Sequence, residues 1–184
     1  YLRETLPVKT CYVFGTDSFL AQLDGAGIPV TRDREQAEVL LCGFDTELTF
    51  QKLEDACILL NRGVLWLATN PDWVCPTWYG SVPDCGSVCR MLTTATGREP
   101  LFLGKPKPAM VELALRRTGF TSEQAVIIGD RLYTDIACGV NAGIDSIFVL
   151  SGEGTEADIA QYGIHPTWIF SDIAALYRQL EETL

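Results

Sequence analysis

The sequence predicts an α/β protein built on parallel sheets, and two observations support this fold class. Short apolar runs, several of them rich in β-branched residues, alternate with longer segments whose apolar residues recur at helical spacing. The alternation continues from the first strand-like run to the last helix-like one, without an internal repeat or a low-complexity tract. Such a pattern is typical of parallel strands joined by right-handed helical crossovers.

The clearest helix in the first half is predicted over residues 50–61. Leu53, Ala56 and Leu60 follow the i, i+3, i+7 spacing of a buried helical face, and Gly63 follows as a stop. The other elements predicted in this half are strands at 11–14, 39–42 and 64–68, helices at 18–25 and 86–94, and a loop at 72–83.

A second series of elements follows the segment 96–100, whose glycine and proline make it the best candidate for a domain boundary. We therefore expect one domain over residues 1–97 and another over residues 98–184. The elements predicted in the second domain are strands at 101–103, 125–128, 146–150 and 168–170, and helices at 109–117, 134–140, 156–162 and 173–181.

Composition narrows the range of partners. The 184 residues, 47% of them hydrophobic, can bury one good core or two small ones. The net charge of −10 argues against nucleic acid and anionic membranes as partners, since like charges would meet. No apolar stretch approaches the ~18 residues of a membrane-spanning helix. An anionic small substrate would need a local positive centre, and Lys105 can supply one.

The seven cysteines favour a reducing compartment. Their spacing is irregular, no Cys-x-x-Cys occurs, and His165 is the only histidine, so a zinc site has little support. Cys42 and Cys57 lie inside apolar runs and have the character of small buried hydrophobic residues. We therefore expect a cytoplasmic protein.

Two carboxylates follow the strand predicted over 125–128. Asp130 comes at the carboxyl end of this strand, the edge at which parallel sheets place ligands. Asp135 falls in the first turn of the next predicted helix, with Thr134 as its N-cap. Hard oxygen ligands suit Mg²⁺, so the pair predicts a magnesium cofactor held by Asp130 and Asp135. The structural alternative is that the first aspartate forms a turn and the second only starts a helix.

Lys105 lies between a predicted strand and a predicted helix, directly after Gly104 and before Pro106. An ammonium group at that point can neutralise a phosphoryl group and a nearby carboxylate, which is an electrostatic role. The alternative is a solvated surface lysine, and this description fits Lys107 better. We favour the functional interpretation for Lys105.

The motifs in combination resemble a known family. Gly-Lys-Pro at 104–106 is followed by GDRLYTDI at 129–136, GVNAGI at 139–144 and VLSG at 149–152; upstream stand GFDTELTF at 43–50, TNPD at 69–72 and PDCGS at 83–87. Together they resemble the haloacid dehalogenase (HAD) superfamily and, more narrowly, its NagD-like and 4-nitrophenylphosphatase branch. This resemblance covers essentially the whole chain. It implies a C2-type α/β cap domain over residues 1–97 and the C-terminal part of a Rossmann-like HAD core over residues 98–184.

The resemblance also implies a reaction. Members of this branch hydrolyse phosphomonoesters with Mg²⁺ through an aspartyl-phosphate. Lys105 corresponds to the catalytic lysine of the third motif, Asp130 to the magnesium ligand of the fourth, and Asp135 to the second acid of that motif, which holds metal-bound water. The nucleophile and the acid/base are two aspartates, two positions apart, on a strand that precedes all of these motifs. The implied substrate is a small phosphorylated metabolite, with a sugar phosphate as one candidate.

This chain contains no Asp-x-Asp pair, and neither Asp17 nor Asp45 has a partner aspartate two residues on. We therefore expect these residues to be inactive alone and to form the C-terminal part of a longer enzyme, as the start at Tyr1 suggests. The absent strand is expected in the centre of the core sheet. The alternative function is a non-catalytic module that binds a phosphate ligand or a partner without hydrolysis.

The segment 72–83 crowds large apolar groups into a predicted loop. By the resemblance it is the specificity loop that a cap lowers over the core site, with Cys75, Trp78 and Tyr79 as substrate contacts and Asp72 as a weaker candidate. The alternative is a contact between cap and core, or a dimer contact, because Trp and Tyr are also enriched at interfaces. A homodimer through the cap is therefore a second partner expectation.

Overall fold

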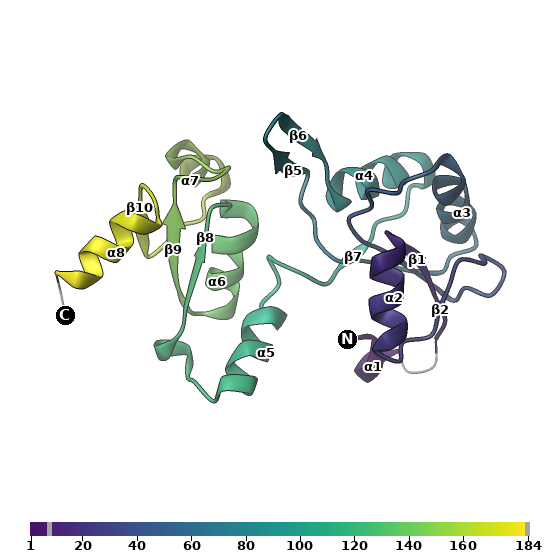
Figure 1. Ribbon diagram of the computed structural model, residues 1–184, viewed down its shortest axis with the longest axis horizontal. Coiled ribbons are helices and arrows are strands. Elements are labelled where there is room, and N and C mark those ends of the chain that lie inside the picture. Colours follow the sequence, from purple (N-terminus) through teal and green to yellow (C-terminus); the bar gives the residue numbers. More distant parts are fainter. Residues whose placement is uncertain (7–8, 183–184) are drawn as a thin grey trace. The chain divides into compact units, whose positions relative to one another are not determined.

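A computed structural model of the chain describes residues 1–6 and 9–182 (Figure 1). The chain divides into two compact units, Tyr1–Leu103 and Gly104–Leu184. Each unit is built on a parallel sheet with connecting helices, which confirms the predicted α/β fold class. Within the described residues no helix combines the length and the apolar character that crossing a membrane requires.

The first unit contains a parallel sheet, a hairpin and the connecting helices: α1 (Leu2–Thr5), β1 (Cys11–Phe14), α2 (Asp17–Gly25), β2 (Val30–Thr31), β3 (Val39–Cys42), α3 (Phe50–Asn61), β4 (Leu65–Ala68), β5 (Val74–Thr77), β6 (Gly80–Pro83), α4 (Cys85–Thr96) and β7 (Leu101–Phe102). The parallel strands pair in the order β2-β1-β3-β4-β7. Tyr12 and Leu40 pack with residues of α3 and α4, while Cys11 and Val39 pack with residues of α2. Helices on both faces therefore bury β1 and β3 at every position.

The prediction of a loop over 72–83 was wrong. Residues 74–77 and 80–83 form the antiparallel hairpin β5-β6, in which Thr77 is paired with Gly80. The Thr77 hydroxyl donates to the Gly80 carbonyl at 2.5 Å, and Gly80 has a φ of 130°, which favours glycine. These features close a tight turn that the aromatic crowding of the segment did not indicate.

The short strand at 101–102 extends the sheet of the first unit. Leu101 is paired with Leu67, and Phe102 with Ala68, so β7 lies beside β4. Leu101 also packs against the buried cluster that contains Leu67. The division between the two units therefore falls after Leu103, whereas the expected domain boundary at residue 97 precedes this strand.

A buried polar network joins β1 to α3 in the first unit. Asp55 is 8% exposed, and its Oδ2 accepts a hydrogen bond from the Tyr12 hydroxyl at 3.0 Å. Its Oδ1 accepts from Arg34 at 2.6 Å and from Gln51 at 3.1 Å. Burial alone would raise the pKa of the Asp55 carboxyl, but these hydrogen bonds together hold its pKa below the ordinary value. The carboxylate is therefore ionised and fully paired.

We predict that Asp55→Ala destabilises the first unit by about 2–3 kcal/mol, because the Tyr12 hydroxyl and Arg34 lose a buried charged acceptor. Since the pKa of Asp55 is lowered by folding, its contribution is present above the unfolded pKa of about 4 and disappears as pH falls through the folded pKa. Urea unfolding at neutral and acidic pH measures both effects. The exposed neighbour Glu54→Ala is the control, expected within about 0.5 kcal/mol of the parent; an equal loss in both variants contradicts the prediction.

The second unit contains three parallel strands and the segments around them: α5 (Ala109–Thr118), η1 (Ser122–Gln124), β8 (Val126–Gly129), η2 (Leu132–Ile136), α6 (Ala137–Ala142), β9 (Asp145–Val149), α7 (Glu156–Tyr162), β10 (Trp168–Phe170) and α8 (Ile173–Glu181). The strands pair in the order β10-β9-β8. Figure 1 shows β8 and β9 side by side with α6 next to them. Gly139 permits this packing, because a Cβ there would lie 2.5 Å from Cγ2 of Ile127. Among the described residues of this sheet, β8 is a terminal strand, and its Val126 and Ile128 are exposed.

Candidate active site

Asp130 directly follows β8, at the carboxyl edge of the parallel sheet. Its backbone carbonyl accepts a hydrogen bond from the N–H of Gly154 at 2.9 Å. Its side-chain Oδ2 accepts one from the N–H of Glu153, also at 2.9 Å. Both donors belong to the segment that follows the neighbouring strand β9. The exits of two adjacent strands therefore fix Asp130 at this edge.

Asp135 is buried in η2, with 7% of its surface exposed. The Lys105 ammonium donates to its Oδ1, and the N–H of Arg131 donates to its Oδ2 at 3.2 Å. Lys105, Asp130 and Asp135, which the sequence nominates as site residues, thus lie on segments that meet at one edge of the sheet. Their roles in catalysis and metal binding stay predictions.

Thr134 does not cap a helix as predicted. It lies inside η2, a π-helical turn in which the N–H groups of Asp135 and Ile136 both donate to the carbonyl of Arg131, at 2.9 and 3.2 Å. The helical turn begins earlier because Leu132 and Ile136 are buried together against Phe148. Thr134 is consequently 1% exposed, and its hydroxyl has no hydrogen-bond partner among the described residues.

Gly129 makes room for Asp135. A Cβ at position 129 would lie 2.1 Å from Cβ of Asp135, too close for any side chain. We predict that Gly129→Ala displaces Asp135 from Lys105 and lowers stability by about 1–3 kcal/mol, the range for overpacking. Chemical denaturation and the amide NMR signals of residues 131–135 measure the two effects. Gly25→Ala, where a Cβ meets nothing within 4 Å, is the matched control; similar behaviour of the two variants contradicts this description of the site.

Cys138 is close to this site but is not equipped as a nucleophile. Burial raises the pKa of its thiol, and the nearby Lys105 charge lowers it by less. Its Sγ donates to the carbonyl of Lys107 at 3.2 Å. A neutral thiol held in this way cannot replace an aspartate nucleophile.

The carboxylates at this edge of the sheet can supply part of the coordination shell of Mg²⁺. Among the described residues, no group of three or more His, Cys, Asp and Glu side chains could hold a metal ion. Asp135 is engaged through both oxygens, whereas the hydrogen bond that the Asp130 side chain accepts from the described residues is at Oδ2. Mg²⁺ keeps several waters and often uses just one or two carboxylates. Asp130 therefore fits as a direct ligand, and Asp135 fits as a residue that acts through Lys105 or bound water.

The predicted substrate contacts all lie in the first unit. Trp78 and Tyr79 form the tip of the β5-β6 hairpin, where they are 94% and 66% exposed, with ring centroids 5.2 Å apart in an edge-to-face arrangement. Cys75 is half-buried on β5, and Asp72 accepts a hydrogen bond from Asn70 at 3.0 Å. Their role in substrate binding stays a prediction.

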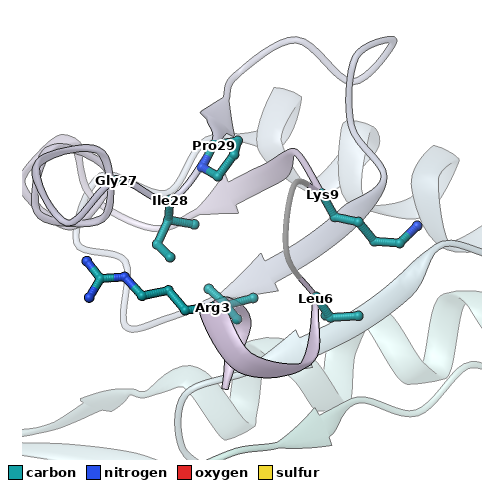
Figure 2. A pocket seen from close by; sticks show the side chains of 7 residues that line it. Arg3, Leu6, Lys9, Gly27, Ile28 and Pro29 are labelled. Atoms are coloured by element: carbon teal, nitrogen blue, oxygen red, sulfur yellow. The ribbon is translucent and has the colours of Figure 1, made fainter.

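A cavity of about 180 Å³ in the first unit lacks the features of a phosphate site (Figure 2). Figure 2 shows its basic side chains, Arg3 and Lys9, pointing in different directions. Arg3 donates to the carbonyl of Ala26, and Lys9 pairs with Glu38 at 3.4 Å. Both positive groups therefore have partners within the first unit.

Sequence reasoning named Gly152 only as part of the VLSG motif and missed Glu153 and Gly154, whose N–H groups donate to Asp130. Gly152 and Gly154 allow the close approach of this segment, because a Cβ at Gly152 would lie 1.9 Å from Oδ2 of Asp130. The Gly-Glu-Gly pattern after an apolar strand was the available signal. Such a pattern at the exit of a strand indicates close backbone packing.

Comparison with known proteins identifies the family of this chain. A family model described as HAD-hydrolase-like matches residues 102–176, which contain Lys105, Asp130 and Asp135. An acid sugar phosphatase of Staphylococcus epidermidis is 32% identical over 182 residues, which cover 99% of this chain and 70% of that protein. The fold is thus that of an HAD-type hydrolase.

Solved structures narrow the class. The 4-nitrophenylphosphatase of Thermotoga maritima superposes with a TM-score of 0.87 at 36% identity, covering 96% of this chain and 67% of that one. A glycerol phosphate phosphatase of Mycobacterium tuberculosis, solved in complex with magnesium, gives a TM-score of 0.85 at 32% identity, covering 95% and 53%. The chain belongs to the HAD-like hydrolases, in the branch of the NagD and 4-nitrophenylphosphatase-type phosphatases.

Proposed function

We propose that this chain is the part of a magnesium-dependent phosphomonoester hydrolase that binds Mg²⁺ and holds the phosphoryl group, and that the enzyme acts on a small phosphorylated metabolite. The observation that carries the proposal is the contact of the Lys105 ammonium with Asp135, beside Asp130, at the carboxyl edge of a parallel sheet. Positive and negative groups set side by side at such an edge suit a phosphate and its counter-ion. The relatives named as sugar and glycerol phosphate phosphatases make a sugar phosphate the leading candidate.

Lys105, Asp130 and Asp135 would have separate roles in this reaction. Lys105, held in place by Asp135, would offset negative charge on the phosphoryl group and on the attacking carboxylate. Asp130 would hold Mg²⁺ directly, while Asp135 would orient a coordinated water. Bound Mg²⁺ would polarise the phosphoryl oxygens as a Lewis acid. The fixed position of Asp130 against residues 153 and 154 would keep this edge preorganised.

The proposal places the nucleophile outside these 184 residues, because no Asp-x-Asp pair occurs within them. Attack on phosphorus needs a carboxylate within near-attack distance of the phosphoryl group. The coding sequence and the intact mass of the natural polypeptide test this point. An Asp-x-Asp-Gly segment ahead of Tyr1 is expected, and a natural product of 20.3 kDa with full activity contradicts it.

We also propose that the first unit acts as the cap and the second as part of the core. The exposed Trp78 and Tyr79, together with Cys75 and Asp72, would contact the leaving group of the substrate. Trp78→Ala is expected to raise the KM for a sugar phosphate by about tenfold, as loss of an aromatic contact does, with a smaller effect on kcat. An unchanged KM for every phosphate tried contradicts the assignment.

The direct assay of the whole proposal is hydrolysis of 4-nitrophenyl phosphate by the natural polypeptide, with Mg²⁺ and with excess chelator. We expect turnover that chelation abolishes and Mg²⁺ restores. The competing function, a phosphate-binding module, is motivated by the absent Asp-x-Asp pair. It predicts saturable binding of inorganic phosphate without turnover under any metal condition.

A further inference from the structure

The segment 152–154 is pressed against Asp130 from two sides. The N–H of Glu153 donates to Oδ2 of Asp130 at 2.9 Å, and the N–H of Gly154 donates to its backbone carbonyl at the same distance. A Cβ at Gly154 would lie 2.6 Å from that carbonyl and 2.7 Å from Cζ of Phe148. This segment therefore has little freedom to move without releasing the Asp130 carboxylate.

The side chain of Glu153 ties the segment back to the chain that follows Asp130. Its Oε2 is 2.5 Å from Nε of Arg131, and the Arg131 side chain is only 13% exposed. Its Oε1 accepts from the Tyr133 hydroxyl at 3.4 Å. The Tyr133 ring in turn lies 5.9 Å from the ring of Tyr162, on α7. Glu153 thus binds Asp130 through its backbone N–H, and its carboxylate contacts Arg131 and Tyr133.

The backbone hydrogen bonds to Asp130 and the side-chain contacts of Glu153 together hold the Asp130 carboxylate in one orientation. If the Arg131–Glu153 pair is broken, the turn keeps the Gly154 hydrogen bond but loses the side-chain anchor that sets the direction of the Glu153 N–H. Oδ2 of Asp130 would then lose its donor for part of the time, and the carboxylate could rotate. A metal ligand whose orientation is not fixed binds its ion less tightly.

We infer that Glu153, through its pair with Arg131, is a positioning residue that orients the carboxylate of Asp130 for a divalent cation. Because the Glu153 N–H occupies Oδ2, Oδ1 would be the oxygen available to a cation. Glu153 itself contacts neither cation nor substrate in this assignment. The inference rests on the proposed function, because it assumes that Asp130 is a Mg²⁺ ligand.

The test is a Mg²⁺ titration of the natural polypeptide followed by amide NMR, which measures weak binding without requiring turnover. In Glu153→Ala we expect the dissociation constant for Mg²⁺ to rise by about 10–100-fold, the usual effect of removing a group that orients a metal ligand. Glu153→Gln keeps an acceptor for Arg131 and Tyr133 and is expected to retain most of the affinity. Arg131→Gln removes the same pair from the other side and should match Glu153→Ala.

Two controls separate the possible failures. Glu112→Ala, an exposed glutamate on α5, should bind Mg²⁺ as the parent does. Asp130→Asn should bind it far more weakly than any Glu153 variant. Parent-like affinity in both Glu153→Ala and Arg131→Gln, with weak binding in Asp130→Asn, overturns the inference and leaves the proposed function intact. Parent-like affinity in Asp130→Asn overturns both.

A purely structural role for Glu153 predicts a different pattern. It would lower the unfolding midpoint measured without Mg²⁺ and leave the dissociation constant unchanged in the folded fraction. A positioning role predicts a higher dissociation constant for Mg²⁺ with little change in the unfolding midpoint. It also predicts a shifted and faster-exchanging amide proton at position 153, because the hydrogen bond from this amide to Asp130 is weakened. An unshifted, equally protected amide in Glu153→Ala contradicts positioning.

Discussion

Replacing Asp130 by alanine is expected to abolish magnesium-dependent hydrolysis of a phosphomonoester by the natural polypeptide, with kcat falling by about 10³-fold or more. The reason is that a backbone donor orients the carboxylate of Asp130, and within the part of the chain that the structure describes no lysine contacts it. Loss of one preorganised electrostatic group alone costs about 10²–10³ in kcat, and loss of a metal ligand removes the cation as well. Steady-state turnover of 4-nitrophenyl phosphate across a range of Mg²⁺ concentrations measures the effect.

Asp145→Asn supplies the matched control for this prediction. Asp145 begins the neighbouring strand β9, is exposed, and accepts a hydrogen bond from Thr167 at 3.0 Å. It therefore lies at the opposite end of the same parallel sheet. We expect Asp145→Asn to keep its turnover within about threefold of the parent, since surface changes away from a site are usually mild. Near-normal turnover in Asp130→Ala would refute the assignment of the site.

Lys105→Ala is expected to impair both activity and stability. Asp135, whose side chain is 11% exposed, would keep its charge but lose the ammonium that contacts Oδ1. Because the Lys105 side chain is 35% exposed, the loss is smaller than for a fully buried pair, and we expect about 2 kcal/mol. Turnover should fall by at least about 10²-fold, since the positive centre facing the phosphoryl group is removed.

A double-variant cycle separates the two effects of Lys105. Adding Asp135→Asn to Lys105→Ala removes the unpaired charge, so we expect stability to recover in part while turnover stays low. Urea unfolding and phosphatase assays on the parent, both single variants and the double variant give the coupling. Recovery of turnover together with stability would show that Lys105 serves only to neutralise Asp135.

The elements whose apolar patterns are strong were predictable from sequence. The strands at 11–14, 39–42 and 168–170 and the helices at 50–61, 156–162 and 173–181 have the predicted bounds. Burial of β1 and β3 on both faces explains why unbroken apolar runs marked them so well. The position of Asp130 was predictable because it follows the apolar run at 125–128.

The details that require contacts distant in sequence were not predictable. The hydrogen bonds from the N–H groups of residues 153 and 154 to Asp130 depend on the register of β8 against β9, which places Gly129 beside Phe148. The π-helical turn around Thr134 depends on the burial of Leu132 and Ile136 against Phe148. The β5-β6 hairpin was missed because Pro76 and the Trp78-Tyr79 pair indicate a loop, whereas the turn is closed by Thr77 and Gly80.

The proposed activity depends most on a divalent cation bound by Asp130 at the sheet edge beside Lys105. Anomalous diffraction from crystals of the natural polypeptide soaked with Mn²⁺ and inorganic phosphate tests this directly, because Mn²⁺ has the oxygen-ligand preference of Mg²⁺. We predict an anomalous peak about 2.1 Å from a carboxylate oxygen of Asp130, with phosphate within reach of the Lys105 ammonium. A Mn²⁺ peak bound elsewhere, with none at Asp130, would contradict the account.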